Sequence, residues 1–391
     1  MATSPPAADP VSLLADLIRC ASVTPIEAGV LDVLESALVT LGFTVTRLRF
    51  EGDGGTYPVD NLFATRGTPD SNEGPHLLFN GHTDVVPPGD RALWTHDPFG
   101  AEIVDDVMYG RGAVDMKSGV AAFVAAAAQP PAKGRISIAI TNDEEHEGIN
   151  GTAKLMAWAA SQGHRFDFAI VGEPSSSARV GDSIKIGRRG SLSGRITVTG
   201  VQGHVAYPHK ALNPLPVAAG LISALSGTLD DGSAHFPASN LEFTSVDVGN
   251  SVTNVIPAVA TLAFNVRYND KWTPESLEEA IREGIESQDD EGTKIEFVTL
   301  GVPSRSFLSP TSGAVETLSE VIEDATGKRP EFSTAGGTSD ARFVAQYCPV
   351  VELGLPGPTM HKADECVPLA DVRALTSLYA AFIQRYLGES S

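Results

Sequence analysis

The sequence predicts an α/β protein, in which a mixed, mainly parallel, doubly wound domain is interrupted by an inserted α+β domain. In the first half, short apolar runs typical of buried strands alternate with helical patterns, the order of a parallel sheet covered by helices. From residue 190 the order becomes strand, helix, strand, strand, helix, strand, which is the ferredoxin-like split motif. After residue 302 the first pattern returns. We therefore expect one domain from residues 1–189 and 303–391, and an inserted domain from residues 190–302.

The first domain is expected to begin with helices at residues 10–20 and 27–41, because Asp9 and Pro10 supply the chemistry of a helix start. Its strands are predicted at residues 43–50, 61–66, 76–80, 135–141, 167–171 and 349–353. Its other helices are predicted at residues 116–129, 151–162, 311–326 and 371–387, with one more after the glycine-rich turn at 335–340.

The inserted domain has its own set of expected elements. Strands are predicted at residues 192–199, 241–248, 259–268 and 294–300, and helices at residues 213–229 and 274–287. Inserts with exposed strand edges often form dimers, but these patterns do not show that for this chain.

Composition and charge exclude several classes of protein. The chain has 391 residues, 42% hydrophobic and 20% charged, which is ordinary for a soluble globular protein of two domains. Its net charge of −21 disfavours binding to nucleic acid or to anionic membranes. Three scattered cysteines, Cys20, Cys348 and Cys366, argue against a disulfide framework and for a reducing compartment. Neither a signal peptide nor a transmembrane pattern is visible, so we expect a cytoplasmic protein.

Polar side chains follow three of the predicted buried strands. His82 and Asp84 come after residues 76–80, Glu144 and Glu145 after 135–141, and Glu173 after 167–171. Taken singly, these are as well explained by loop caps and solvated turns. In an open α/β sheet, however, sites form at the carboxyl ends of the strands, where these residues would meet. His82 and Asp84 also point to one side of an extended chain, so that one could bind a metal ion while the other orients it.

Asp115 lies in a loop with three glycines, residues 109–119, that leads into a helix. A lone carboxylate at this place usually caps the helix. Together with the strand-end residues and with His361, which follows the last strand, Asp115 could instead bridge two metal ions.

These candidate ligands are histidines and carboxylates without cysteine, which suits catalytic Zn²⁺, or Co²⁺ or Mn²⁺, rather than a structural zinc site. Two histidines and three carboxylates are too many for one tetrahedral ion with an open position. Two ions about 3.5–4 Å apart, bridged by one carboxylate, fit better. One of the glutamates should then stay off the metal to transfer protons.

With these motifs in place, the sequence resembles the co-catalytic dizinc peptidase and deacylase family. The matching segments are residues 81–84, 110–119, 143–145, 171–174, 187–191, 203–209, 254–257, 336–340 and 360–362. Residues 187–191 and 203–209 are most similar to the subgroup that removes succinyl groups. Some relatives carry an asparagine four residues before the last histidine ligand, where this chain has Gly357.

The resemblance implies a role for each site residue. Asp115 would bridge two Zn²⁺ ions, for which Co²⁺ can substitute, and a cis peptide bond would follow it at Met116. The remaining metal ligands would be His82 and Glu173 for one ion, and Glu145 and His361 for the other. Asp84 would orient His82, and Glu144 would act as general base and then as general acid.

The resemblance also implies a homodimer, in which the inserted domain is the dimerisation and lid domain. His204 would reach the partner subunit's site and donate a hydrogen bond to the oxyanion, although it could also be an ordinary loop histidine. Arg188 and Arg267 would bind substrate carboxylates, with a structural ion pair as the alternative for each. The other substrate-binding candidates are Tyr207, Asn254, Gly337 and Thr338.

The implied reaction is hydrolysis of N-succinyl-LL-2,6-diaminopimelate to succinate and LL-2,6-diaminopimelate, a step of lysine and diaminopimelate biosynthesis. The alternatives within this chemistry are an acetylornithine deacetylase, another N-acyl-amino-acid hydrolase, or a dimetal exopeptidase. A non-catalytic binding protein on a retired hydrolase fold is disfavoured, because the base and all five ligands are present.

Overall fold

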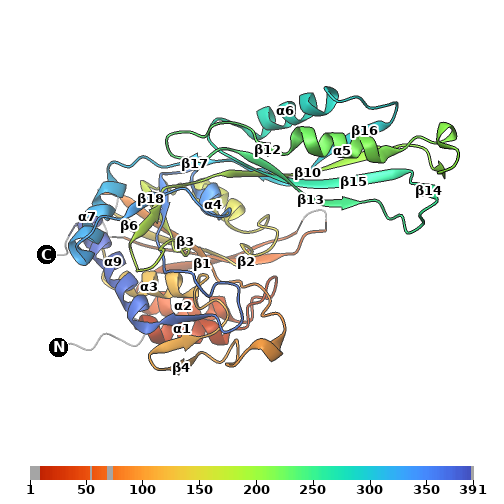
Figure 1. Ribbon diagram of the computed structural model, residues 1–391. Helices are drawn as coiled ribbons and strands as arrows, with labels where there is room; N and C mark the ends of the chain where they lie inside the picture. Colours follow the sequence, from red (N-terminus) through yellow and green to blue (C-terminus); the bar gives the residue numbers. More distant parts are fainter. Residues whose placement is uncertain (1–8, 53–54, 68–73, 389–391) are drawn as a thin grey trace. The chain divides into compact units, whose positions relative to one another are not determined.

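The computed structural model describes residues 9–52, 55–67 and 74–388 (Figure 1). Its contacts divide the chain into two compact units. Unit 1 comprises Met1–Ile186, Ser309–Ser333 and Ser339–Ser391, and unit 2 comprises Gly187–Leu308 and Thr334–Thr338. The expected insertion, residues 190–302, therefore lies inside unit 2, which also takes up the short segment Thr334–Thr338.

Unit 1 is built on a mixed eight-stranded sheet. In spatial order its strands are β1 (Thr44–Phe50), β2 (Val59–Gly67), β6 (Arg135–Thr141), β3 (His76–His82), β7 (Phe168–Val171), β19 (Val350–Glu352), β8 (Ser183–Lys185) and β18 (Glu331–Ser333). The pairs β6–β3, β3–β7, β7–β19 and β8–β18 are parallel, and the others are antiparallel. This confirms the mixed, mainly parallel sheet that the sequence predicts, and β8 and β18 are additions to it.

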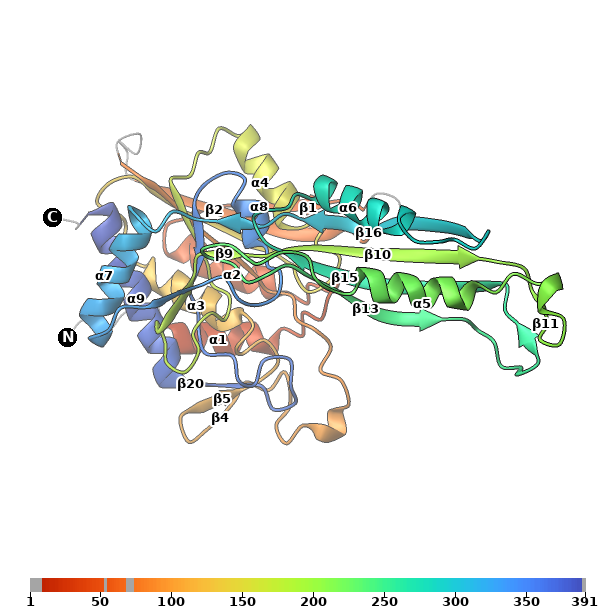
Figure 2. The ribbon, with the colours of Figure 1, turned by 45° about the horizontal axis from the view of Figure 1, so that its top comes forward.

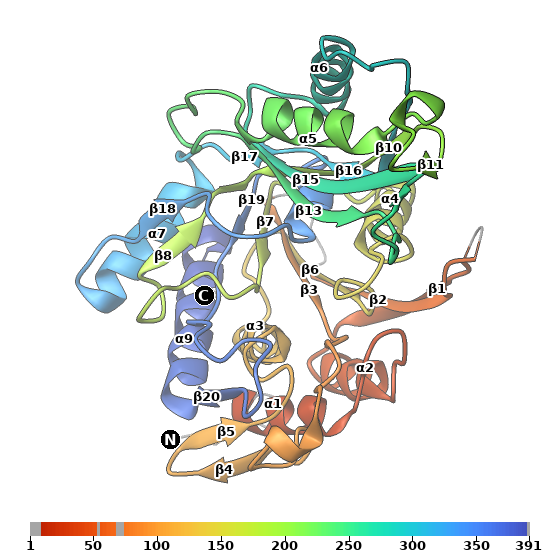
Figure 3. The same ribbon diagram turned by 45° about the vertical axis from the view of Figure 1, so that its right-hand side comes forward.

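Helices cover both faces of this sheet (Figure 3). One face packs on α1 (Pro10–Arg19), α2 (Val30–Thr40), α3 (Lys117–Ala126), α7 (Ala314–Thr326) and α9 (Leu369–Leu387), and the other carries α4 (Thr152–Ser161) and α8 (Ala341–Val344). The alternation of β3 explains the two layers. Phe79 stacks on Phe123 and meets Tyr379, whereas Asn80 donates a hydrogen bond to Thr152 of α4. A smaller sheet of β4 (Glu102–Val104), β5 (Val107–Tyr109) and β20 (Cys366–Pro368) completes the unit.

Unit 2 has the predicted ferredoxin-like order (Figure 2). Its main elements are β10 (Gly190–Thr199), α5 (Pro214–Leu225), β13 (Asn240–Asp247), β15 (Val259–Tyr268), α6 (Pro274–Glu286) and β16 (Lys294–Ser304). The strands are antiparallel in the order β13-β15-β10-β16, with β12 (Gly227–Thr228) beside β13. The helix predicted for 213–229 ends at Leu225, because Gly227 adopts a positive φ and the chain turns into β12.

One face of the unit 2 sheet is apolar and the other is polar. Leu192, Ile196 and Val266 form a core with residues of α5 and α6. Ser191 and Arg267 are directly opposed across β10 and β15, on the side facing away from that core. The period-2 pattern of these strands therefore corresponds to one covered and one uncovered face.

No helix among the described residues combines the length and the apolar composition that crossing a bilayer requires.

His76 is a buried histidine of β3 whose ring bonds the Ser137 hydroxyl. Burial, reinforced by the neighbouring His164, lowers its pKa from 6.5 to about 4. Between these two pH values, His76 is therefore protonated in the unfolded chain and neutral in the folded protein. The contribution of His76 to the free energy of unfolding is therefore fully present above pH 6.5. It is lost as the pH falls toward 4, by up to about 3 kcal/mol.

We expect His76→Gln to weaken this acid sensitivity. Guanidinium unfolding of both proteins at pH 7.5 and 5 would measure it, because the other titrating groups are common to both. An equal loss of stability in the two proteins would contradict this role of His76.

Candidate dimetal site

The candidate ligands stand at the carboxyl ends of four neighbouring strands. His82 ends β3, Glu145 follows β6, Glu173 follows β7 and His361 follows β19. These strands are adjacent and parallel in the order β6-β3-β7-β19, so their ends meet at one edge of the sheet. Asp115 reaches the same place from the loop between β5 and α3.

The two carboxylate oxygens of Asp115 face different histidines. Its Oδ1 lies 3.3 Å from His82 Nε2, and its Oδ2 lies 3.3 Å from His361 Nε2. His82 Nε2 also lies 3.4 Å from Glu173 Oε1, and His361 Nε2 lies 3.0 Å from Glu145 Oε1. The cluster thus consists of two similar halves that share Asp115. The peptide bond from Asp115 to Met116 is cis, as the resemblance implies.

Two sets of ligand atoms lie close enough to surround a metal ion. The atoms of His82, Glu144 and Glu173 lie within 4.8 Å of one another, and so do those of His82, Asp115 and Glu145. Glu144 therefore lies as close to His82 and Glu173 as a further ligand would.

Asp84 organises this edge of the sheet with two different groups. Its main-chain carbonyl accepts a hydrogen bond of 2.9 Å from His82 Nδ1. Its carboxylate accepts from the backbone N–H groups of Glu144, at 3.2 Å, and Glu145, at 2.9 Å. The carboxylate oxygen lies 3.6 Å from His82 Nδ1, too far for a hydrogen bond. The orienting contact to His82 is therefore made by the carbonyl of Asp84, while the carboxylate holds the two glutamates.

This contact suits His82 for metal binding. A carbonyl oxygen only accepts hydrogen bonds, so Nδ1 carries a proton in both charge states of His82, and it is Nε2, facing Asp115 and Glu173, that gains or loses the second proton. Glu173 Oε1 is buried and lies 3.4 Å from this nitrogen. When a metal ion displaces the proton of Nε2, an imidazole nitrogen and carboxylate oxygens form the donor set that Zn²⁺ and related ions prefer.

Charge is crowded at this site. Burial, and then the charge of Glu173, raises the pKa of Glu144 well above its usual value. Burial and Asp115 raise the pKa of Glu173 to about 7. Hydrogen bonds to Asp115 and Glu145 raise the pKa of His361 to about 10. Burial opposes protonation of His82, but hydrogen bonds to Asp115 and Glu173 raise its pKa well above the usual value. Divalent ions would compete with protons for these groups.

Glycines permit the close packing around Glu173. A Cβ on Gly119 of α3 would lie 2.3 Å from the carbonyl oxygen of Gly172, and one on Gly354 would lie 2.3 Å from that of Glu173. The main chain before and after Glu173 is therefore in contact with two other segments that only glycine can bring so near.

The predicted substrate-binding residues all belong to unit 2, in two separate groups. The first group lies at the start of β10. The buried Arg188 donates hydrogen bonds to the carbonyls of Ala335, at 3.4 Å, and Gly337, at 3.1 Å. Thr338 is next to Gly337, and Arg267 is opposite Ser191 in the β10–β15 pair. Arg188 thus supports the glycine-rich segment through main-chain carbonyls.

The second group lies beyond the far end of β10, where β11 (Gly203–His204) pairs with β14 (Val255–Ile256). His204 and Tyr207 are exposed and their rings lie 5.8 Å apart, and the carbonyl of Asn254 accepts a hydrogen bond from Val205. Figure 2 shows β11 at the tip of this unit. Because β10 has ten residues, the two groups lie about 30 Å apart.

Three buried charged residues near Asp115 were not singled out in the sequence. Lys117 donates hydrogen bonds to the carbonyls of Leu17 and Cys20, which attaches the start of α3 to α1. Arg111 and Glu365 form an ion pair of 2.6 Å. In the sequence, Glu365 is only the second residue of an acidic pair shortly after His361, which does not indicate its contact with Arg111.

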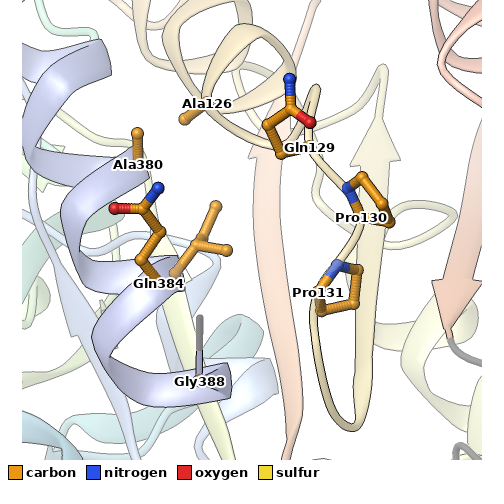
Figure 4. Close-up of a pocket in the computed structure, with 8 residues that line it drawn as sticks. Ala126, Gln129, Pro130, Pro131, Ala380, Gln384 and Gly388 are labelled. Atoms are coloured by element: carbon orange, nitrogen blue, oxygen red, sulfur yellow. The ribbon is translucent and has the colours of Figure 1, made fainter. Parts of the chain in front are cut away.

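A surface pocket of unit 1 lies elsewhere, between the C-terminal ends of α3 and α9 (Figure 4). Its lining is Ala126, Gln129, Pro130, Pro131, Ala380, Ile383, Gln384 and Gly388, without a titratable group. The length of α3 separates it from Asp115 by about 15 Å, so it has no part in the chemistry proposed below.

The doubly wound sheet with its inserted ferredoxin-like unit carries a histidine–carboxylate cluster at its strand ends, an arrangement that suits a metal-dependent hydrolase. Residues 78–385 match the model of peptidase family M20/M25/M40. The chain belongs to that family, and is an enzyme of its hydrolase type.

Several solved structures share the fold of this chain. A metallo-carboxypeptidase of family M20 from Sulfolobus solfataricus is 16% identical, with a TM-score of 0.78 over 97% of this chain and 99% of that chain. A tripeptidase from Staphylococcus aureus is 20% identical, with a TM-score of 0.76 over 97% of this chain and 98% of the other. A dinuclear metal-binding M20 peptidase from Bacillus subtilis is 17% identical, with a TM-score of 0.70 over 97% of both chains. At such low sequence identities, these similarities show a shared fold and nothing more.

We expect Gly119→Ala to destabilise unit 1 by about 1–3 kcal/mol, because the new methyl group would meet the main chain at Gly172. Gly220 of α5 is a matched control, since a Cβ there meets nothing within 4 Å, and Ala should raise helix stability slightly. Denaturant unfolding of both variants would measure this, and equal effects would contradict the tight packing at Gly119.

Proposed function

We propose that the protein is a dimetal amidohydrolase that releases succinate from N-succinyl-LL-2,6-diaminopimelate, a succinyl-diaminopimelate desuccinylase. The observation that carries the dimetal chemistry is the arrangement at Asp115, whose two oxygens each lie 3.3 Å from a different histidine. The succinyl substrate is supported by the resemblance of residues 187–191 and 203–209 to the desuccinylase subgroup.

In this proposal the residues that hold the ions are the two halves of the cluster. His82 and Glu173 would hold one Zn²⁺ together with Asp115, and Glu145 and His361 would hold the other, also with Asp115. Co²⁺ would substitute in the same donor set. When bound, such ions polarise a carbonyl group and make water a nucleophile near neutral pH.

Glu144 would transfer the proton. Its backbone is held by the Asp84 carboxylate, and its burial among carboxylates raises its pKa, so that it accepts a proton readily. Its carboxylate would take a proton from the attacking water while the oxygen bonds to the amide carbon. It would then deliver that proton to the amine nitrogen as the carbon–nitrogen bond breaks.

Two arginines are candidates to bind the three carboxylates of the substrate. Arg267 lies on the uncovered polar face of the unit 2 sheet, near the start of β10, where Arg188, Gly337 and Thr338 also lie. Arg188 donates to two carbonyls of the glycine-rich segment, and Arg267 is opposite Ser191 on the polar face of the sheet, so either guanidinium could make a bidentate contact with a substrate carboxylate.

His204, Tyr207 and Asn254 would act in the site of a partner subunit. Their separation of about 30 Å from Arg188 and Arg267 supports this, since one substrate of this size cannot touch both groups of a single unit 2. The protein would then be a homodimer in which His204 donates a hydrogen bond to the oxyanion of the partner's substrate.

The second candidate function is hydrolysis of another N-acyl amino acid, such as N-acetylornithine, or of a small peptide. The fold neighbours that are peptidases favour this alternative. An acetyl group carries no distal carboxylate, so that substrate requires one anionic contact fewer.

The substrate is tested by measuring amine release from N-succinyl-LL-diaminopimelate and from N-acetylornithine with Zn²⁺-loaded protein. We expect the succinyl compound to be preferred, and Arg267→Gln to reduce that preference by roughly tenfold or more, because a charged hydrogen bond is lost. Arg195→Gln, on the same sheet face further along β10, is the matched control. Preference of the wild type for the acetyl compound would overturn the proposed substrate.

The dimeric site is tested by mixing two inactive proteins. We expect Glu144→Gln to lower kcat by about 10²–10⁴-fold without loss of metal ions, because only proton transfer is removed. We expect His204→Ala also to be nearly inactive. Mixed dimers of the two would contain one intact site each, so activity should return on mixing. Failure to recover activity in verified mixed dimers would show that His204 does not act on the partner.

A further inference from the structure

Glu365 is a buried carboxylate that connects the two loops carrying Asp115 and His361. It lies directly before β20, where the pairing of Cys366 with Tyr109 of β5 places it beside Gly110. Its main-chain carbonyl accepts a hydrogen bond of 2.8 Å from the Gly110 N–H. The strand pair therefore sets Glu365 in register with the beginning of the Asp115 loop.

The two oxygens of the Glu365 carboxylate have different partners. Oε2 accepts a hydrogen bond of 2.6 Å from Arg111 Nη1. Oε1 accepts from the backbone N–H groups of Val114, at 2.8 Å, and Asp115, at 3.2 Å. Glu365 is completely buried and Arg111 almost so, and the guanidinium lies over the ring of Trp94 at 5.3 Å. Such charge-assisted bonds in a buried place are strong and directional.

These contacts bear on the geometry of the site. Asp115 lies in an irregular loop, and its own N–H and that of Val114 both donate hydrogen bonds to Glu365. The Asp115 side chain meets His361, only four residues before Glu365. The same two segments are thus joined twice, once through the side chain of Asp115 and once through its main chain.

We propose that Glu365, supported by Arg111, is a positioning residue that fixes Asp115 against the His361 segment so that the two halves of the site have the spacing a metal pair needs. The inference rests on the proposed dimetal function. A role limited to folding stability would lower the stability of unit 1 without a particular effect on metal affinity.

The test is Glu365→Gln, measured for metal affinity. A carboxamide can accept from the backbone or from Arg111, but its NH₂ group then faces a donor on the other side. We expect the dissociation constants for Zn²⁺ and Co²⁺ to rise by about 10–100-fold, as is usual when a group that orients a metal ligand is lost. Calorimetric titration of metal-free protein and the visible spectrum of the Co²⁺ form provide readouts that do not depend on activity.

Asp182→Asn is the matched control. The Asp182 carboxylate accepts from three backbone N–H groups, those of Ser177, Ala178 and Arg179, in a turn outside the candidate site. The Asp182→Asn substitution should lower the stability of the protein without changing its affinity for metal ions. Equal affinities in Glu365→Gln and wild type would overturn the inference, as would an equal loss of affinity in Asp182→Asn.

Two further outcomes are decisive. If Glu365→Gln does not fold, Arg111→Lys replaces it, and we expect a smaller loss of affinity in the same direction. An unchanged affinity there would overturn the inference. A wild-type protein that binds no divalent ion would overturn the proposed function itself, and this inference with it, whereas unchanged affinity in a variant of a two-ion protein overturns the positioning role alone.

Discussion

The parallel pairing of β6, β3, β7 and β19 is the constraint on which the site depends. Side chains from residues as distant in sequence as His82 and His361 meet because each follows a strand of this block. The helices on both faces bury the strands, so polar side chains can gather only at the strand ends and in the loops that follow them. Asp115 is a central ligand that comes from outside this block, and other contacts hold its loop. Its N–H donates a hydrogen bond to Glu365, and the nearby Lys117 donates one to the Leu17 carbonyl of α1.

The cluster is also an electrostatic constraint. Buried carboxylates repel one another, and the pKa values of Glu144 and Glu173 rise because burial and neighbouring charge penalise their ionised forms. At Asp115 the hydrogen bonds with the two histidines outweigh the penalty of burial, and the pKa of this carboxyl lies below its usual value. Two divalent cations would neutralise the remaining negative charge of these carboxylates, so metal binding would also stabilise the folded site.

Much of this organisation could be predicted from local sequence patterns. Apolar runs followed by His82, Glu145 and Glu173 identify both the strands and their ends, and the period-2 pattern of β10 and β15 identifies the two faces of unit 2. The short strands β8 and β18 escaped prediction because three residues contain too little periodicity. The contacts from Glu365 to the Asp115 backbone and from Arg188 to Gly337 escaped for another reason. A side chain that bonds a remote main chain leaves no pattern in the sequence around it.

The antiparallel pair β10–β15 limits which insertions and deletions this protein can accept during evolution. It acts as a spacer of fixed length between its two ends, and its side chains alternate between a buried and an open face. Adding or deleting a single residue in each strand would exchange the faces and bring polar groups into the core. Lengthening is tolerable only in pairs of residues, each pair moving the tip by about 7 Å. Evolution of the reach of this unit should therefore proceed in discrete steps rather than by gradual adjustment.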